Sequence, residues 1–286
     1  MEMRILSRSL CLIADVHGNA SALEAVLKDA AKADCTDYLS VGDIVKRGPR
    51  PQECVDLLRQ VKTKSWVMGN HEKTYHDMLA DHDPHTQGAK RIMEIILNAY
   101  DYFYLNDLTY QWLANLPYLQ ICQFEGLKIA IMHALPNKPW GNETNPRSDQ
   151  ENFDQMLKKS AADLAVYGHT HKQLMRYSTQ DRLVINPGSV GMPTTSGTWQ
   201  HNNLAQYTIL RLTGADVLEI DFRRVAYDIQ SEIMTACERN LPYGDLYCDL
   251  LRTGEYTYSV ERIEEYNQRY QYDSITNFKE YFAWKK

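Results

Sequence analysis

The sequence lacks most features that would indicate a secreted, membrane-bound or metal-knuckle protein. Its six cysteines include no Cys-x-x-Cys pair and are spread over the whole chain, which favours reduced, buried thiols over a disulfide framework. No apolar run approaches the ~20 residues of a membrane-spanning helix. The short run near the N-terminus ends at Asp15, too early for a secretory signal. We therefore expect a cytoplasmic protein with no membrane partner.

The chain also lacks an excess of positive charge. Its 286 residues include 37 acidic and 31 basic side chains, for a net charge of −6. This balance argues against a stable nucleic-acid partner held by phosphate neutralisation. A small anionic substrate remains compatible, because bound metal ions can supply local positive charge. The apolar fraction of 44% and the charged fraction of 24% are typical of one large globular domain, with or without an appendage.

The N-terminal part of the chain predicts three strand–helix units in which polar residues follow each strand. Short apolar runs at 10–14, 38–41 and 65–68 read as buried strands. They are followed by Asp15-Val16-His17, Gly42-Asp43 and Gly69-Asn70-His71. Open α/β sheets bind ligands at this end of their strands. Side chains at i and i+2 of a strand point to the same side, so Asp15 and His17 can bind one ligand together. A carboxylate beside an imidazole suits a metal ion such as Mn, Fe or Zn.

The rest of the chain predicts two helical segments around a second group of strands. Residues 72–117 leave the strand–helix rhythm and predict helices near 92–103 and 108–116. Within this segment His82 and His85 could bind metal, but a solvated loop is the favoured interpretation. Period-two patterns then predict a hairpin at 119–132 that ends on His133. Further strands are expected at 164–167, 182–185, 205–212 and 217–223, a helix near 152–159, and a tyrosine-rich helical tail from about 226.

Candidate ligands gather at the ends of five predicted strands. A single zinc site needs three or four ligands, whereas seven ligands that include a carboxylate able to bridge suit two metals about 3.5–4 Å apart. Each piece alone has a simpler interpretation as a common turn or a solvated loop. Their joint occurrence at strand ends favours a metal centre. The candidate ligands are Asp15, His17, Asp43, Asn70, His133, His169 and His171.

This series of motifs resembles the calcineurin-like metallophosphoesterase superfamily. Five motifs occur in order between about residues 10 and 225, including Gly69-Asn70-His71-Glu72 and Gly168-His169-x-His171. The resemblance implies an α/β fold, a four-layer α/β/β/α sandwich of two mixed sheets. The implied division is a metallophosphoesterase domain at 1–225, with a helical insertion at about 72–117, and a C-terminal helical appendage at 226–286 packed on it.

The resemblance also implies a role for each residue at the site. It implies two divalent metal ions per chain, with Mn or Fe favoured by the mixed ligand set and Zn, Co or Ni possible. Asp43 would bridge the two ions, His71 would face the leaving group, and Arg47 would hold a substrate phosphate, although a surface charge explains Arg47 equally well. Asp15, His17 and His171 would hold the first ion. Asn70, His133 and His169 would hold the second.

The subfamily is indicated by shorter segments. Residues 42–48 resemble protein serine/threonine phosphatases and symmetrical diadenosine tetraphosphatases, but the His169-x-His171 pair departs from them and fits the smaller bacterial phosphodiesterase branch. Within that branch, four segments resemble the bacterial asymmetrical diadenosine tetraphosphate hydrolases. They are 133–136 with Trp140-Gly141, 165–168, 222–225, and 186–189, which also reads as a structural turn.

The resemblance implies a metal-dependent phosphoesterase in which a metal-bound hydroxide attacks phosphorus and His71 protonates the leaving oxygen. The expected partner is a small anionic nucleotide, diadenosine tetraphosphate, cut to ATP and AMP; an oligomer is possible. A general or cyclic-nucleotide phosphodiesterase is the alternative, and a non-catalytic scaffold of the same fold is another. The insertion and the tail could wall the cleft. An adenine could stack on Tyr100, Tyr102, Phe103 or Trp140, although such spacing also fits core packing.

Overall fold

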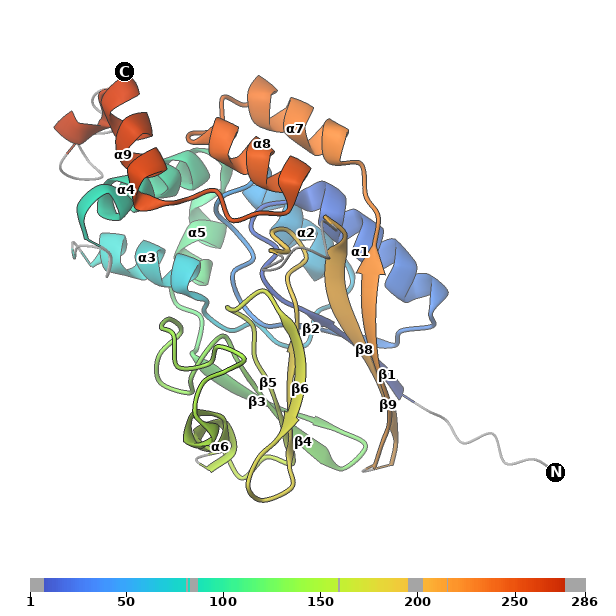
Figure 1. Ribbon diagram of the computed structural model, residues 1–286. Coiled ribbons are helices and arrows are strands. Elements are labelled where there is room, and N and C mark those ends of the chain that lie inside the picture. Colours follow the sequence, from blue (N-terminus) through green and yellow to red (C-terminus); the bar gives the residue numbers. More distant parts are fainter. Residues whose placement is uncertain are drawn as a thin grey trace.

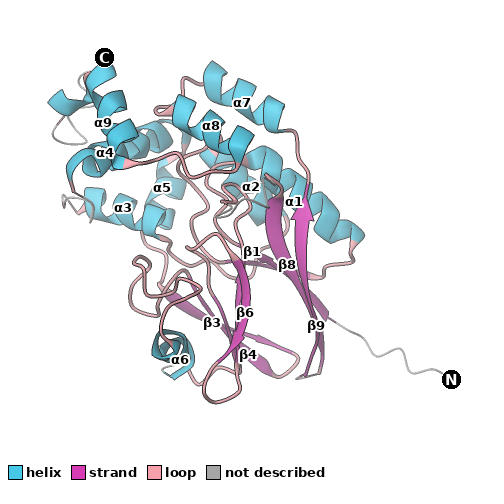
Figure 2. Cartoon of the chain, in the orientation of Figure 1, coloured by secondary structure: helices cyan, strands magenta, loops and turns pink. Residues whose placement is uncertain are grey.

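Two mixed β-sheets pack face to face in the computed structural model, and helices cover both outer faces (Figures 1 and 2). The structure describes residues 8–80, 82, 87–158, 160–194, 203–214 and 216–275. This four-layer arrangement confirms the predicted fold class. The first sheet has the order β2-β1-β8-β9 and the second the order β3-β4-β5-β7-β6.

The strands of the first sheet are β1 (Arg8–Ile13), β2 (Asp37–Ser40), β8 (Ala205–Thr213) and β9 (Asp216–Val225). The strands of the second are β3 (Leu119–Phe124), β4 (Leu127–Met132), β5 (Leu164–Val166), β6 (Gln173–Tyr177) and β7 (Leu183–Pro187). Each sheet contains neighbouring strands that run parallel: β1 beside the edge strand β2 in the first sheet, and β4, β5 and β7 together in the second. Their carboxyl ends therefore meet at one edge of the sandwich, where the predicted ligands follow.

Alternation along β1 explains why its sequence is apolar throughout. Cys11 and Ile13 face the core beneath α1 (Ala20–Lys32) and α2 (Pro51–Gln60). Leu10 and Leu12 face the core between the two sheets. A strand buried on both faces reads as a continuous apolar run. A third core lies under α6 (Gln150–Lys158), where Phe153 packs with residues of the second sheet.

The remaining helices form a layer above the ends of the strands. They are α3 (Asn70–Leu79), α4 (Gly88–Tyr104), α5 (Asp107–Leu113), α7 (Ile229–Glu238), α8 (Gly244–Thr253) and α9 (Val260–Arg269). The apolar stripe of α4 packs in one core with the tail helices, and α5 packs instead with the core under α1 and α2. In Figure 1, α4 lies beside α9, while α7 and α8 lie over α1 and α2.

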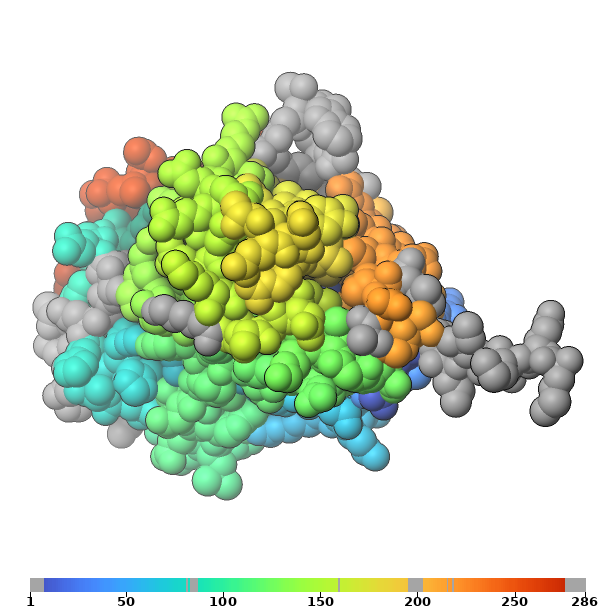
Figure 3. Space-filling view, turned by 90° about the horizontal axis from the view of Figure 1, so that it is seen from below, coloured from blue at the N-terminus to red at the C-terminus, as the bar shows by residue number. Residues whose placement is uncertain are grey.

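The surface opposite this helical layer belongs mainly to the second sheet and its connections. Seen from below, residues coloured green to yellow form the centre of this face, and the orange residues of β9 flank them (Figure 3). Among the described residues, no helix is both long and apolar enough to cross a membrane.

Two predictions about strands were wrong. The segment 65–68 forms only an isolated bridge from Ser65 to Leu39, because its next amides bond elsewhere: Trp66 N donates to the side chain of Gln120 at 3.0 Å, and Met68 N donates to a carbonyl at 2.8 Å. The edge strand β6 was missed. It is half-exposed and pairs only with β7, so its sequence carries no clear alternation.

A buried cluster of charges joins α4 to the loop that follows β2. Lys46 is fully buried, and its Nζ lies 2.5 Å from Glu94 Oε2 on α4 and 2.6 Å from Thr74 Oγ1 on α3. Arg47 donates to Glu94 Oε1 at 2.9 Å. The single carboxylate of Glu94 thus pairs with two buried cations. Burial of a charged side chain is costly unless the charge is paired in this way.

We predict that Glu94→Gln lowers the free energy of unfolding by about 3–5 kcal/mol, because Lys46 and Arg47 lose the only carboxylate within this cluster. Urea denaturation measures the change. The matched control is Glu53→Gln, which removes a partly exposed ion pair to Arg239 and should cost at most about 1 kcal/mol. Equal losses in the two variants would contradict the prediction.

Candidate metal centre

The seven predicted ligands meet at the carboxyl ends of the parallel strands. Asp15 and His17 follow β1, Asp43 follows β2, and His133 follows β4 directly. The remaining three are Asn70, the first residue of α3, and His169 and His171, which lie between β5 and β6. Asp15, His17, Asp43 and His133 are buried, whereas Asn70, His169 and His171 are partly exposed. The carboxylates of Asp15 and Asp43 and the rings of His17, His71, His133 and His171 form three overlapping groups that could each hold a metal ion.

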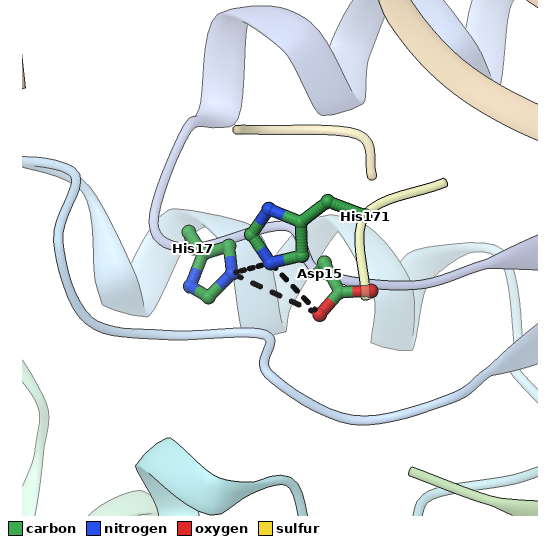
Figure 4. Close-up of side chains that lie close together, drawn as sticks. All are labelled: Asp15, His17 and His171. Carbon is green, nitrogen blue, oxygen red and sulfur yellow. Dashed lines mark hydrogen bonds and ion pairs between the residues drawn. The ribbon is translucent and has the colours of Figure 1, made fainter. Parts of the chain in front are cut away.

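The first group consists of Asp15, His17 and His171, whose side chains point toward one another (Figure 4). The Nε2 atoms of the two histidines are 3.0 Å apart, and Asp15 Oδ1 lies 3.3 Å from His171 Nε2 and 3.8 Å from His17 Nε2. Burial lowers the pKa of His17 well below its usual range, so the ring is neutral. Burial alone would also lower the pKa of His171, but Asp15 outweighs it and raises that pKa.

Hydrogen bonds to backbone carbonyls orient the histidine rings. The Nδ1 of His171 lies 2.7 Å from Met192 O, so in the neutral ring Nδ1 donates and Nε2 carries the lone pair. His133 Nδ1 makes the same contact with Val41 O at 2.8 Å, and His169 Nε2 with Gly141 O at 2.9 Å. Backbone carbonyls commonly fix metal-binding histidines in this way.

The second group consists of Asn70, His133 and His169. Asn70 Oδ1 lies 3.2 Å from His133 Nε2 and 2.8 Å from His169 Nδ1. If both rings are neutral and oriented by the carbonyls, as metal binding would require, these three atoms are all acceptors, and a cation between them would satisfy all three. Burial, reinforced by His133, lowers the pKa of His169 to about 4. Burial alone would lower the pKa of His133, but Asp43 outweighs it and raises that pKa to about 10.

Asp43 lies between the two groups. Its Oδ2 is 3.2 Å from His133 Nε2 and 3.9 Å from His17 Nε2, and its Oδ1 accepts the backbone N–H of His71 at 3.0 Å. Burial alone would raise the pKa of this carboxyl, but the nearby histidines, His133 first, lower it well below its usual range. An ionised carboxylate between two groups of ligands is in the position of a bridge.

The backbone at the site is held in an unfavourable conformation. Five predicted ligands have positive φ, between 50° and 69°: Asp15, His17, Asp43, His169 and His171. Such residues cost of order 1–3 kcal/mol each and cluster at functional sites. Gly69 shows how closely the loops approach, because a Cβ there would lie 2.0 Å from Asp43 Oδ1. The loops can therefore hold these side chains together only through strong contacts elsewhere.

Glu72 provides such contacts, and the sequence alone did not predict its role. Its fully buried carboxylate accepts the backbone N–H groups of Asp43 at 3.0 Å, Ile44 at 2.8 Å and Gly69 at 2.9 Å. These bonds tie the loop after β2 to the start of α3. Burial, together with Asp43, raises the pKa of Glu72 to about 7. The available signal was an acidic residue at the third position of a helix, which is typical of a capping box.

His71 and Arg47 also line the site. His71 Nε2 lies 3.8 Å from Asp43 Oδ2 and Nδ1 lies 3.7 Å from Glu94 Oε2, and burial lowers the pKa of this histidine. Arg47 is 8% exposed, bonds to Glu94, and lies over the Tyr258 ring at 4.7 Å. Arg47 is therefore a buried part of the wall and not a surface charge. The predicted roles of both residues remain predictions.

The site opens into a cavity of about 340 Å³. Besides residues of the sandwich, its lining includes Lys90, Met93 and Glu94 from α4, and Tyr256 and Tyr258 from the tail. The insertion and the tail therefore contribute to its wall, as the sequence predicted. Both were expected to do so from their position outside the sandwich, but the lining residues themselves were not identified.

The predicted stacking residues lie elsewhere. Tyr100 is buried and donates its hydroxyl to Pro49 O at 3.1 Å, Tyr102 packs edge-on against Tyr110, and Phe103 is 74% exposed. Neither these three residues nor Trp140 is among the described residues that line the cavity. For Tyr100 and Tyr102 the helical spacing reflects packing, which was the favoured interpretation of the sequence.

Two further segments had been considered for the site. In 186–189, Asn186 Nδ2 donates to Gly168 O at 2.7 Å and Ser189 Oγ donates to Asp15 O at 2.8 Å. This segment is a structural turn that supports two ligand-bearing loops, as the alternative interpretation had it. In the 81–85 segment only His82 is described, and it is exposed; His85 lies outside the described residues.

Comparisons with known proteins agree with this geometry. An uncharacterised protein of Methanocaldococcus jannaschii, MJ0912, is 28% identical over 250 residues, which cover 82% of this chain and 93% of that protein. A metallophosphoesterase from Sphaerobacter thermophilus is 28% identical with a TM-score of 0.64, covering 86% of this chain and 99% of that one. A hypothetical protein of Pyrococcus horikoshii, PH1004, shares the fold, with a TM-score of 0.69 at 19% identity over 86% of this chain and 98% of that one.

The family comparison covers most of the sandwich. Residues 9–209 match the calcineurin-like phosphoesterase superfamily domain, a range that includes every predicted ligand. This family uses divalent metals, and the buried Asp and His groups of this chain could hold them. The chain therefore belongs to the calcineurin-like phosphoesterase superfamily, and it is a metal-dependent phosphoesterase.

Proposed function

We propose that this chain hydrolyses phosphate ester or anhydride bonds of a small nucleotide at a centre of two divalent ions, with diadenosine tetraphosphate, cut to ATP and AMP, as its substrate. The observation that carries the proposal is the convergence of seven oxygen and nitrogen ligands around Asp15 and Asp43, next to a cavity of about 340 Å³. A scaffold that had lost its chemistry would be expected to lack some of these residues.

The ligand set fits two ions. Asp15, His17 and His171 would hold one ion, Asn70, His133 and His169 the other, and Asp43 both. The mixture of carboxylate, amide and imidazole ligands favours Mn or Fe. When bound, two such ions lower the pKa of water and neutralise charge on phosphoryl oxygens.

The chain's own groups would act on the remaining atoms of the substrate. His71 Nε2 lies beside Asp43 and the ring lines the cavity, so it can donate a proton or a hydrogen bond to the leaving oxygen. The nearby Glu94 carboxylate faces the Nδ1 side of the ring at 3.7 Å. Arg47 and Lys90 both line the cavity; because Glu94 already pairs with Arg47, Lys90 is the cation that would be available to a further phosphate of the substrate.

The substrate itself is supported less directly than the reaction. The resemblance of 133–136, 165–168 and 222–225 to asymmetrical diadenosine tetraphosphate hydrolases motivates the choice. The alternative is a general or cyclic-nucleotide phosphodiesterase, which would use the same ligands.

One prediction of the proposed function concerns the metal content of the chain. Protein purified without chelator and reconstituted with excess Mn or Fe should approach two ions per chain by elemental analysis. Asp43→Asn should lower the metal content. It should also reduce the hydrolytic activity by more than the roughly 10–100-fold that is typical when a residue bonded to a metal ligand is removed. Asp154→Asn, which changes a carboxylate bonded to Thr179 on the surface, should change neither. Saturation of the unmodified chain at one ion would contradict the prediction.

The second prediction separates proton donor from ligand. His71→Ala should keep both ions and slow esters with poor leaving groups by about 10²–10⁴-fold, because general acid catalysis contributes that much. An activated aryl phosphate should be much less affected. His76→Ala is the matched control, since this histidine lies on the same helix and contacts Ala114 O. Equal losses on activated and unactivated esters would argue against His71 as the donor.

The third prediction is the cut position. Chromatography of the products from diadenosine tetraphosphate should show ATP and AMP in equal amounts. Two ADP molecules would assign the chain to the symmetrical mode of cleavage. Hydrolysis of a cyclic nucleotide or an aryl phosphodiester without turnover of the tetraphosphate would leave the phosphodiesterase alternative. No hydrolysis of any of these by the metal-loaded chain would favour the scaffold.

A further inference from the structure

The connector between α8 and α9 places an exposed aromatic ring at the cavity. Tyr256 is 59% exposed and lines the cavity, whereas its neighbours Thr257 and Tyr258 are 7% and 2% exposed. A single exposed aromatic side chain is common on a protein surface; what distinguishes Tyr256 is that its exposed ring lines the cavity beside the candidate metal ligands.

The connector is anchored on both sides of this ring. Gly254 closes α8, with φ of 71° and its N–H donating to Leu250 O at 2.8 Å. Thr257 Oγ1 donates to Leu246 O at 2.6 Å, and Ser259 caps the start of α9. The backbone that carries Tyr256 is therefore anchored before any ligand arrives. Only the side-chain torsions of Tyr256 would have to be ordered when a ligand stacks on its ring, which limits the entropy cost of binding.

A chain of contacts connects Tyr256 to the proposed proton donor. His71 faces Glu94 at 3.7 Å, and Glu94 accepts from Arg47 at 2.9 Å. The Arg47 guanidinium lies 4.7 Å from the centre of the Tyr258 ring, which is 6.0 Å from the Tyr256 ring. Tyr256 and His71 thus line the same cavity and are connected through these buried side chains.

We propose that Tyr256 is a specificity-determining residue on which a planar aromatic group of the substrate, a nucleobase or an aryl ring, stacks. This inference rests on the proposed phosphoesterase function and narrows it to esters that carry such a ring near the reacting phosphate. Stacking selects for a flat ring and not for one particular base, because every base presents a π-face. The class of substrate is therefore a nucleotide or aryl ester and not an alkyl ester.

The test is a comparison of two ligands that differ only in the base. Adenosine monophosphate and ribose 5-phosphate are titrated into the metal-loaded chain by calorimetry. The unmodified chain should bind the nucleotide more tightly. Tyr256→Ala should raise the Kd for adenosine monophosphate by about 5–100-fold, the range expected for loss of one stacked base, and leave the Kd for ribose 5-phosphate unchanged. Tyr256→Phe should retain tight binding, since it keeps the ring.

The matched control is Tyr177→Ala, a tyrosine that is 54% exposed on β6 and does not line the cavity; it should alter neither Kd. Equal binding of the two ligands by the unmodified chain, or an equal loss for both in Tyr256→Ala, would overturn the inference. The binding test is independent of turnover. If the chain hydrolyses no nucleotide ester, the proposed function fails, whereas hydrolysis with no effect of Tyr256→Ala on binding removes only this inference.

Discussion

The carboxylate of Glu72 is the group on which the rest of the site depends. It accepts three close backbone N–H groups, from Asp43, Ile44 and Gly69, and so joins the loop after β2 to the first turn of α3. Asp43, the proposed bridge, and Asn70, a proposed ligand, stand on the two segments that it joins. Asp43 has a positive φ, which is an unfavourable backbone conformation. The hydrogen bonds to Glu72 stabilise this conformation.

A second carboxylate, Glu94, connects this centre to the helical layer. It lies on α4, neutralises the buried Lys46 and Arg47, and faces His71. Arg47 in turn lies over Tyr258 of the tail. The insertion and the tail are therefore joined to the site by buried charge as well as by the apolar core that α4 shares with the tail helices. A shift of α4 would separate Glu94 from Lys46 and Arg47 and leave two buried cations unpaired. These ion pairs therefore fix the position of α4 in the cavity wall.

The residues that the chain shares with its family and the residues of its tail occupy different parts of the sequence. The family match covers residues 9–209 and includes all seven proposed ligands and His71. Tyr256 and Tyr258 lie beyond it, in the tail, yet they line the same cavity. If Tyr256 stacks on the substrate as proposed, the sandwich would supply the reaction and the tail part of the recognition. Such a separation fits the general observation that one fold supports different functions through the residues around its site.

The sequence by itself determined the candidate strands and the polar residues that follow them, because both are local patterns: apolar runs for buried strands, and Asp, Asn or His directly after each run. The four-layer sandwich, and the meeting of His133 and His169 with Asp43 at one edge of it, were expected only from the resemblance of these motifs to a known family. Only the tertiary structure decided that 65–68 forms no ladder, that Glu72 and Glu94 hold the loops, and that Tyr256, rather than Tyr100, lines the cavity. Those outcomes depend on contacts between residues far apart in the chain, such as Lys46 with Glu94, and no local pattern of hydrophobicity or spacing records them.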